Sequence, residues 1–172
     1  MAELRSHIAS EHPDLPVVLI GHSMGGLIAL RTVLDAAPDY QTLILTGPLL
    51  GVPAPPPAWQ TWLVRTLSTL FPAAKALEID ASAVSRDQAV VDDYVADPLV
   101  NHENIPARTV VSLFDEASAV LGRASEISLP TLLLHGEEDE LTSVPASRQF
   151  MADLSATDKH ITAVSYTHLT LP

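Results

Sequence analysis

The chain has 172 residues, no cysteine, a formal net charge of −12 and 47% hydrophobic residues. This length suffices for one domain with a sizeable core, and no apolar run approaches the length of a membrane span. The lack of cysteine excludes disulfides and thiolate metal sites, and the negative charge argues against nucleic-acid or anionic-membrane partners. Because no basic region leads into an apolar stretch after Met1, the sequence shows no export signal and predicts a cytoplasmic location.

The first elements expected are a helix over residues 2–11 and a buried strand over 17–20. Leu4 and Ile8 lie one helical turn apart, and Pro13 ends the helical pattern. The strand is apolar throughout, as strands buried on both faces are. The chain therefore begins as an α/β protein.

A strand, a tight turn and a helix meet at residues 21–26, Gly-His-Ser-Met-Gly-Gly. The G-x-S-x-G spacing is that of a nucleophile elbow, in which a serine occupies strained backbone where the chain reverses. We expect side chains at Gly21 and Gly25 to collide with the neighbouring strand and helix, and Gly26 to let the helix approach the sheet. Ser23 is the candidate nucleophile, and a purely structural turn serine is the alternative.

A helix over about 23–37 and a short strand over 42–46 complete a parallel unit, for which a right-handed connection is expected. Residues 48–128 then show no strand pattern, which favours a helical insertion at the substrate-binding ends of the strands. Three helices are expected in it, at residues 59–71, at 85–96 with a capping box of Ser85 and Gln88, and at 108–123.

The α/β pattern resumes with a buried strand over 131–135 and a helix over about 145–154. Four acidic residues lie in the turn between them, and the strand ends in a histidine. The expected fold is thus a parallel sheet interrupted by a helical segment.

The elbow closely resembles that of the monoacylglycerol lipase and lysophospholipase branch of the α/β-hydrolases. Residues 84–100 resemble the cap segment of this family, and residues 129–139 (Leu-Pro-Thr-Leu-Leu-Leu-His-Gly-Glu-Glu-Asp) resemble the strand and turn that deliver its triad acid. Asp158 and Lys159 are similar to the lead-in to its last strand. The resemblance covers residues 1 to about 162.

The resemblance implies an incomplete α/β-hydrolase fold with a parallel sheet of about three strands. Its expected parts are the elbow-bearing core (1–48), a helical cap or lid (49–128), the core with the triad acid (129–163) and a tail (164–172). Complete members place four strands and a second oxyanion donor before the elbow. The resemblance therefore implies a truncated chain with little or no activity, and an uncovered apolar sheet edge beside the nucleophile strand.

The family's catalytic roles transfer to three positions. Ser23 is implied as the nucleophile, Asp139 as the acid that orients the catalytic histidine, and the backbone N–H of Met24 as one oxyanion donor. For Asp139 the alternative is that it is one acidic turn residue among three others: Glu137, Glu138 and Glu140.

No histidine of the chain is expected to be the catalytic base. An adjacent side chain on a strained turn points elsewhere, so His22 is expected to pack or hydrogen-bond near the site, and His135 to be an interior residue beside it. Surface positions are expected for the histidines without supporting context: His7, His12, His102 and His160.

His168 completes the chain order serine, acid, histidine that α/β-hydrolases use. However, residues 164–172 (Val-Ser-Tyr-Thr-His-Leu-Thr-Leu-Pro) match the translation of a transposon-type sequencing adapter. The family's last strand continues instead as an apolar run, then glycine, then the histidine. We therefore expect an artefactual tail, with a true triad role for His168 as the alternative.

The leading functional prediction is a serine hydrolase of carboxylic esters, acting on monoacylglycerols or lysophospholipids through an acyl-enzyme on Ser23. The alternatives are a thioesterase, acyltransferase or peptidase of the same fold, or a lipid-binding member without catalysis. No metal, cofactor or nucleic acid is expected, and the partner is a lipid ester. In the cap, Trp59, Trp62 and Phe71 could line an acyl-chain channel or touch a membrane surface, whereas ordinary packing of at least half of them is the alternative.

Overall fold

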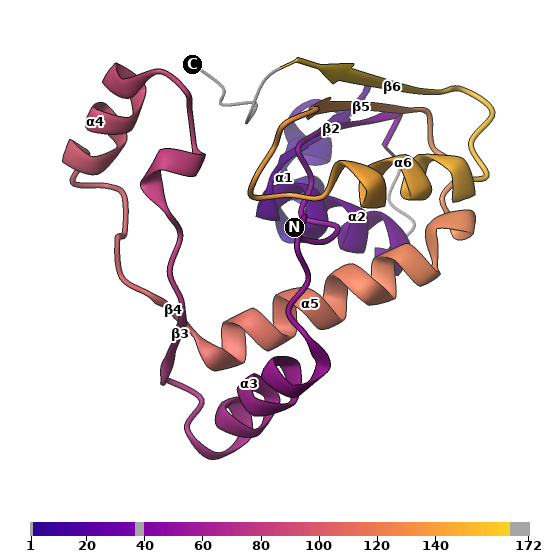
Figure 1. The fold of residues 1–172 in the computed structure, drawn as a ribbon. Helices are drawn as coiled ribbons and strands as arrows, with labels where there is room; N and C mark the ends of the chain where they lie inside the picture. The colour runs from indigo at the N-terminus through magenta and orange to yellow at the C-terminus, as the bar shows by residue number, and fades with distance from the viewer. Residues whose placement is uncertain (1, 37–39, 166–172) are drawn as a thin grey trace.

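A four-stranded parallel sheet forms the centre of the protein in the computed structural model, which describes residues 2–36 and 40–165 (Figure 1). The strand order is β1-β2-β5-β6, so the predicted parallel α/β architecture is confirmed. The strands are β1 (Val18–His22), β2 (Thr42–Thr46), β5 (Thr131–Gly136) and β6 (Lys159–Val164). The sheet has four strands where about three were expected, because β6 begins with the two polar residues Lys159 and His160, which obscure its strand pattern.

Three helices cover one face of this sheet: α2 (Met24–Ala36), α5 (Ala107–Gly122) and α6 (Val144–Asp153). Alternate strand residues point to them and are completely or almost completely buried, because successive side chains of a strand point to opposite faces. These core residues are Leu19, Leu43, Leu45 and Leu133. The remaining helix of the core, α1 (Ala2–Glu11), precedes the sheet in the chain, as predicted.

The register of the sheet places the turns after β1 and β5 at the same edge. His22 of β1 is level with Thr46 of β2, and Thr46 is level with Leu134 of β5. The carboxyl ends of these parallel strands therefore lie together, as ligand sites of open α/β sheets require.

β1 is an edge strand, with β2 as its partner in the described sheet. On the face away from α2, Val18 is 45% exposed and Ile20 is 61% exposed. The uncovered apolar surface expected beside the nucleophile strand is present.

The insertion extends from the core, as Figure 1 shows on the left of the view. It contains α3 (Ala58–Leu70), β3 (Lys75–Leu77), the 3-10 turn η1 (Ala81–Ala83), α4 (Gln88–Ala96) and β4 (Ile105–Pro106). The expectation of a strand-free insertion was wrong, because β3 and β4 form a short antiparallel pair. These strands are too short to show an alternating sequence pattern.

The long helix α5 connects the insertion to the core. At its start, the Ala107 N–H donates a hydrogen bond to the Ala74 carbonyl of the insertion at 2.8 Å. The same helix packs along α3. Farther along, Ala117 and Val120 belong to the hydrophobic core. One rigid element thus contacts both parts of the fold.

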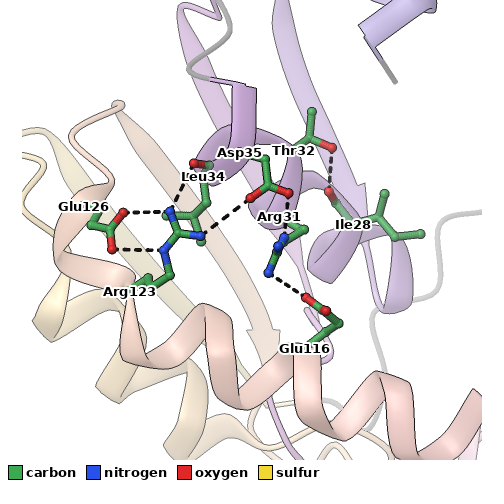
Figure 2. A network of polar contacts seen from close by, with 8 residues as sticks. All are labelled: Ile28, Arg31, Thr32, Leu34, Asp35, Glu116, Arg123 and Glu126. Carbon is green, nitrogen blue, oxygen red and sulfur yellow. Dashed lines mark hydrogen bonds and ion pairs between the residues drawn. The ribbon is translucent and has the colours of Figure 1, made fainter.

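An ion-pair network joins α5 to the nucleophile helix α2 (Figure 2). Arg31 pairs with Asp35 at 2.7 Å on its own helix and with Glu116 of α5 at 3.0 Å. Just past α5, Arg123 binds both carboxylate oxygens of Glu126 in the 3-10 turn η2 (Ala124–Glu126) and contacts Asp35 at 3.6 Å. These ion pairs therefore connect α2 to α5, in addition to the apolar contact between the two helices.

The start of α4 differs from the predicted capping box. Asp87 is the cap, and its carboxylate accepts the Ala89 N–H at 2.9 Å. Ser85 lies two residues earlier, buried, and its hydroxyl accepts the Asp87 N–H at 3.1 Å. Across the described residues, no helix combines the length and apolar character that crossing a membrane requires.

Candidate active site

Ser23 occupies left-handed backbone, with φ = 49°, in the turn between β1 and α2. It is the one non-glycine residue with positive φ in the described part of the chain. Such a conformation costs an L-residue about 1–2 kcal/mol. The surroundings hold it there: Ser23 N–H donates to Thr46 at 3.0 Å, and its carbonyl accepts the N–H groups of Gly26 and Leu49, each at 3.0 Å. Strain kept by so many contacts is typical of a functional turn.

Two glycines make this turn sterically feasible. A Cβ on Gly21 would lie 2.7 Å from the Gly25 carbonyl oxygen and the Gly26 Cα, and a Cβ on Gly26 would lie 2.8 Å from the Pro48 Cβ. The expected collision at Gly25 is wrong, since a Cβ there meets nothing within 4 Å. Gly25 lies in the first turn of α2, on its open side.

Met24 is the first residue of α2, and its side chain is 49% exposed. Its N–H is one of the four at a helix start that lack an intrahelical acceptor, and the helix dipole favours negative charge there. This position suits an oxyanion donor. That role for Met24 stays a prediction.

Asp139 lies in the turn after β5, with its carboxylate completely buried. Oδ1 accepts the N–H groups of Leu141 and Thr142, each at 2.8 Å, and Oδ2 accepts the Thr142 hydroxyl at 2.9 Å. The other acidic residues of the turn are exposed: Glu137, Glu138 and Glu140. Burial therefore separates Asp139 from its neighbours, which favours the acid role that the sequence motif implied.

Ser23 and Asp139 follow strands β1 and β5, with β2 between them. At about 4.8 Å per strand spacing, the two strands lie about 10 Å apart. A third side chain must therefore bridge the hydroxyl and the carboxylate for the two to act together, and an imidazole is the group that can donate to one and accept from the other.

His135, at the end of β5, is buried completely. Its Nδ1 lies 2.9 Å from Ser147 Oγ, and its Nε2 lies 3.0 Å from Thr142 Oγ1 and 3.6 Å from Asp139 Oδ2. The prediction of an interior residue beside the site is confirmed. Thr142 and Ser147 were missed from the sequence, where the only signal was a threonine three residues after an aspartate in a turn.

The remaining histidines are distributed as predicted where the structure describes them. His22 is partly buried, with Nδ1 2.8 Å from Thr46 Oγ1 and 3.1 Å from the Thr46 carbonyl oxygen. Four others are exposed: His7, His12, His102 and His160. His168 lies outside the described residues.

The apolar stripe of α3 faces outward. The packing alternative was wrong, because Trp59, Trp62 and Phe71 are 64%, 67% and 64% exposed. The helix packs on α5 through its other side, where Ser68 is buried and Arg65 pairs with Asp115 through both terminal guanidinium nitrogens. No contact of Trp59 or Trp62 with a substrate follows from this placement.

A groove of about 730 Å³ lies inside the insertion, away from both Ser23 and Asp139. It is walled by the segment around η1 and by the residues on either side of β4. Its lining includes Glu78, Asp80, Tyr94, Asn101, His102 and Glu103. The candidate active site is thus not this groove but the strand ends.

Comparison with known proteins agrees with this geometry. A hydrolase family model, described as serine aminopeptidase, S33, matches residues 1–168. The chain is 33% identical over 153 residues to a monoacylglycerol lipase of Mycolicibacterium smegmatis, covering 89% of this chain and 55% of that protein. It is 30% identical over 150 residues to the monoglyceride lipase of Homo sapiens, covering 87% of this chain and 50% of that protein.

A crystal structure of the monoacylglycerol lipase of Paleococcus ferrophilus has the same fold, with a TM-score of 0.80 and 27% identity. The comparison covers 97% of this chain and 66% of that one, and this chain spans about half the length of the curated relatives it matches. The strand order, the elbow and these similarities agree: the chain belongs to the serine aminopeptidase S33 family, in the monoacylglycerol lipase and lysophospholipase branch of the α/β-hydrolases.

Proposed function

We propose that this chain carries the nucleophile and the acid of a serine hydrolase that cleaves carboxylic esters of monoacylglycerols or lysophospholipids. The observation that carries the proposal is the strained Ser23 directly after β1, at the same edge of the sheet as the buried Asp139 in the turn after β5. The named activity of the relatives favours a glycerolipid ester as the substrate.

In the proposed reaction, Ser23 Oγ attacks the ester carbonyl carbon while a histidine base accepts its proton. The Met24 N–H stabilises the oxyanion of the tetrahedral intermediate, which collapses as the alcohol leaves with that proton. Water then attacks the acyl-enzyme, with the same histidine as base, and releases the fatty acid and free Ser23. Asp139 orients the imidazole and stabilises its charged form.

The base is the residue that the described part of the chain does not supply. His22 and His135 are engaged with Thr46, Thr142 and Ser147, and the other described histidines are exposed. His168, the sequence candidate, therefore needs a direct experiment.

Labelling with a fluorophosphonate, followed by peptide mass spectrometry, tests the nucleophile. An adduct on Ser23, absent in Ser23→Ala, supports the proposal, and an adduct that persists in Ser23→Ala contradicts it. Hydrolysis of monoacylglycerols against a thioester and a peptide series then tests the substrate class. If ester turnover is lost in His168→Ala but kept in His160→Ala, His168 is the base and the artefact prediction for residues 164–172 is wrong.

We further propose that α3 meets a lipid surface. Its outward stripe consists of Trp59, Trp62, Leu63, Leu70 and Phe71, each at least 51% exposed. An exposed apolar patch of this kind marks an interaction site, and tryptophans suit the lipid–water interface. The net charge of −12 disfavours anionic lipid, so zwitterionic vesicles are the expected target.

Co-sedimentation with phosphatidylcholine vesicles tests this contact. Replacing Trp59 and Trp62 together by serine is expected to reduce the bound fraction. The matched control is Leu99→Ser, since Leu99 is 91% exposed but lies outside the stripe. Equal binding of both variants and wild type would contradict a role for α3.

A further inference from the structure

Four buried polar side chains form a continuous hydrogen-bonded line that ends at the candidate acid. Ser147 of α6 contacts His135 Nδ1 at 2.9 Å, His135 Nε2 contacts Thr142 Oγ1 at 3.0 Å, and the Thr142 hydroxyl donates to Asp139 Oδ2 at 2.9 Å. All four residues are at most 6% exposed. Because an unpaired polar group is costly to bury, we expect all of these hydrogen bonds to be formed in the folded protein.

The direction of the protons along this line follows from the carboxylate. An ionised carboxylate only accepts hydrogen bonds, so the single Thr142 hydroxyl proton points to Asp139 Oδ2. Thr142 Oγ1 can then only accept from His135, which requires a proton on Nε2. The Nδ1 atom remains for the Ser147 hydroxyl.

The same residues determine how the Asp139 carboxylate is turned. Backbone N–H groups of Leu141 and Thr142 hold Oδ1, and the Thr142 side chain holds Oδ2. Thr142 therefore contacts both oxygens, and its own hydroxyl is oriented by His135. Rotation of the carboxylate about its Cβ–Cγ bond would break this set of bonds together.

We propose that Thr142 and His135 are positioning residues for Asp139, with His135 protonated on Nε2 so that Thr142 donates to the carboxylate. The proposal rests on the proposed function in one respect, that Asp139 is the acid of a serine hydrolase. In such an enzyme the acid sets the orientation and tautomer of the catalytic histidine. A carboxylate held in one orientation delivers that effect before any substrate binds.

The proton position can be measured in the folded wild-type protein by long-range ¹H–¹⁵N NMR of the His135 imidazole. A proton on Nε2 is the expected result. An unprotonated Nε2 with a proton on Nδ1 overturns the proposal without any variant, because Thr142 would then donate to His135 rather than to Asp139.

Substitutions at position 142 test the positioning itself. Thr142→Val keeps the side-chain shape and removes the hydroxyl, whereas Thr142→Ser keeps the hydroxyl. We expect Thr142→Val to change the His135 nitrogen shifts and the amide proton shift of Leu141, and Thr142→Ser to restore both. Thr131→Val is the matched control, because Thr131 is also buried on β5 but its hydroxyl donates to the Leu129 carbonyl and not to Asp139 or His135.

The reaction supplies a second and separate readout. The rate of fluorophosphonate labelling at Ser23 is expected to fall by up to about 100-fold in Thr142→Val, the loss that a misplacement of about 1 Å in a catalytic geometry can cause, and to stay unchanged in Thr131→Val. If wild type labels but Thr142→Val labels equally fast with unchanged Leu141 shifts, the positioning proposal is wrong. If wild type labels at a residue other than Ser23 although Nε2 is protonated, the proposed function fails and the hydrogen-bond arrangement stands.

Discussion

Arg86 forms an ion pair with Glu138, which links the insertion to the turn that carries Asp139. Arg86 directly precedes Asp87, the cap of α4, and Glu138 directly precedes the candidate acid. Both side chains are about half exposed, at 47% and 61%. The pair therefore connects the position of α4 to one of the two turns of the candidate active site.

Removing this link is expected to loosen the insertion while leaving the core intact. In Arg86→Gln, amide hydrogen exchange should become faster in α4, because the helix loses its tether to the core. Global stability should change by less than about 1 kcal/mol, since exposed ion pairs contribute little. Exchange mass spectrometry and urea denaturation measure the two effects.

Arg148→Gln is the control for this prediction. Arg148 of α6 pairs with Glu137 in the same turn at 3.5 Å, but both of its ends belong to the core. Exchange in α4 should therefore stay at its wild-type rate. Equal acceleration in both variants would mean that the turn, rather than the link to the insertion, controls α4.

Because the backbone of Ser23 is left-handed, glycine at this position should give a more stable protein than alanine, the reverse of the order within a helix. Ser23→Ala keeps the strain and Ser23→Gly relieves it, so the glycine variant should be more stable by about 1 kcal/mol. Urea unfolding of the two variants measures the difference. At Ser6, an exposed position within α1, alanine should instead be favoured by about 1 kcal/mol, as in ordinary helices. A glycine variant at position 23 that is no more stable than alanine would contradict the strain.

The elbow could be predicted from sequence because all of its determinants are local. An apolar run, a G-x-S-x-G turn and a helical pattern admit few backbone solutions, and the structure has strand, left-handed serine and helix in that order. The hydrogen bonds that orient the Asp139 carboxylate could not be predicted in the same way. Thr142 and Ser147 both contact His135, and the Ser147 contact depends on how α6 packs on β5.

The direction in which α3 packs also escaped prediction. Helical periodicity groups Trp59, Trp62 and Phe71 with other apolar residues, and the usual inference buries the more apolar face. In the structure the less apolar face is the one that packs, where Arg65 pairs with Asp115 of α5. Sequence periodicity shows that a helix has two faces but not which of them finds a partner.

Alanine substitutions at two glycines of the elbow should have opposite effects on stability. Gly21→Ala places a Cβ 2.7 Å from backbone atoms that cannot move aside, which should destabilise the protein by about 1–3 kcal/mol. Gly25→Ala meets open space in a helix, where the change should stabilise by about 0.4–1 kcal/mol through the unfolded chain. Thermal or urea unfolding distinguishes these results. A Gly25→Ala variant as unstable as Gly21→Ala would contradict the geometry of the turn.

The pairing of Arg123 with Glu126 in Figure 2 predicts a stability difference that depends on pH. The hydrogen bond from Arg123 lowers the pKa of Glu126 below its ordinary value of 4.5. A carboxyl whose pKa is lowered by folding stabilises the folded state above its unfolded pKa, and this contribution is lost as the pH falls through the folded pKa. Glu126→Gln should therefore lower the urea midpoint at pH 7, by a small amount because the pair is exposed. The difference from wild type should shrink as the pH falls below the ordinary pKa of 4.5 and vanish once the pH is below the lowered pKa of the folded state.

The origin of this difference can be tested in a double-variant cycle with Arg123→Gln. Without the guanidinium, the pKa of Glu126 loses the cause of its shift, so Glu126→Gln should no longer change the pH dependence. The measurement is the urea midpoint from pH 3 to pH 7 for the four proteins of the cycle. If the pH-dependent difference persists in the Arg123→Gln background, a partner other than Arg123 stabilises the charged form of Glu126. The pairing of Arg123 with Glu126 would then not explain the pH dependence.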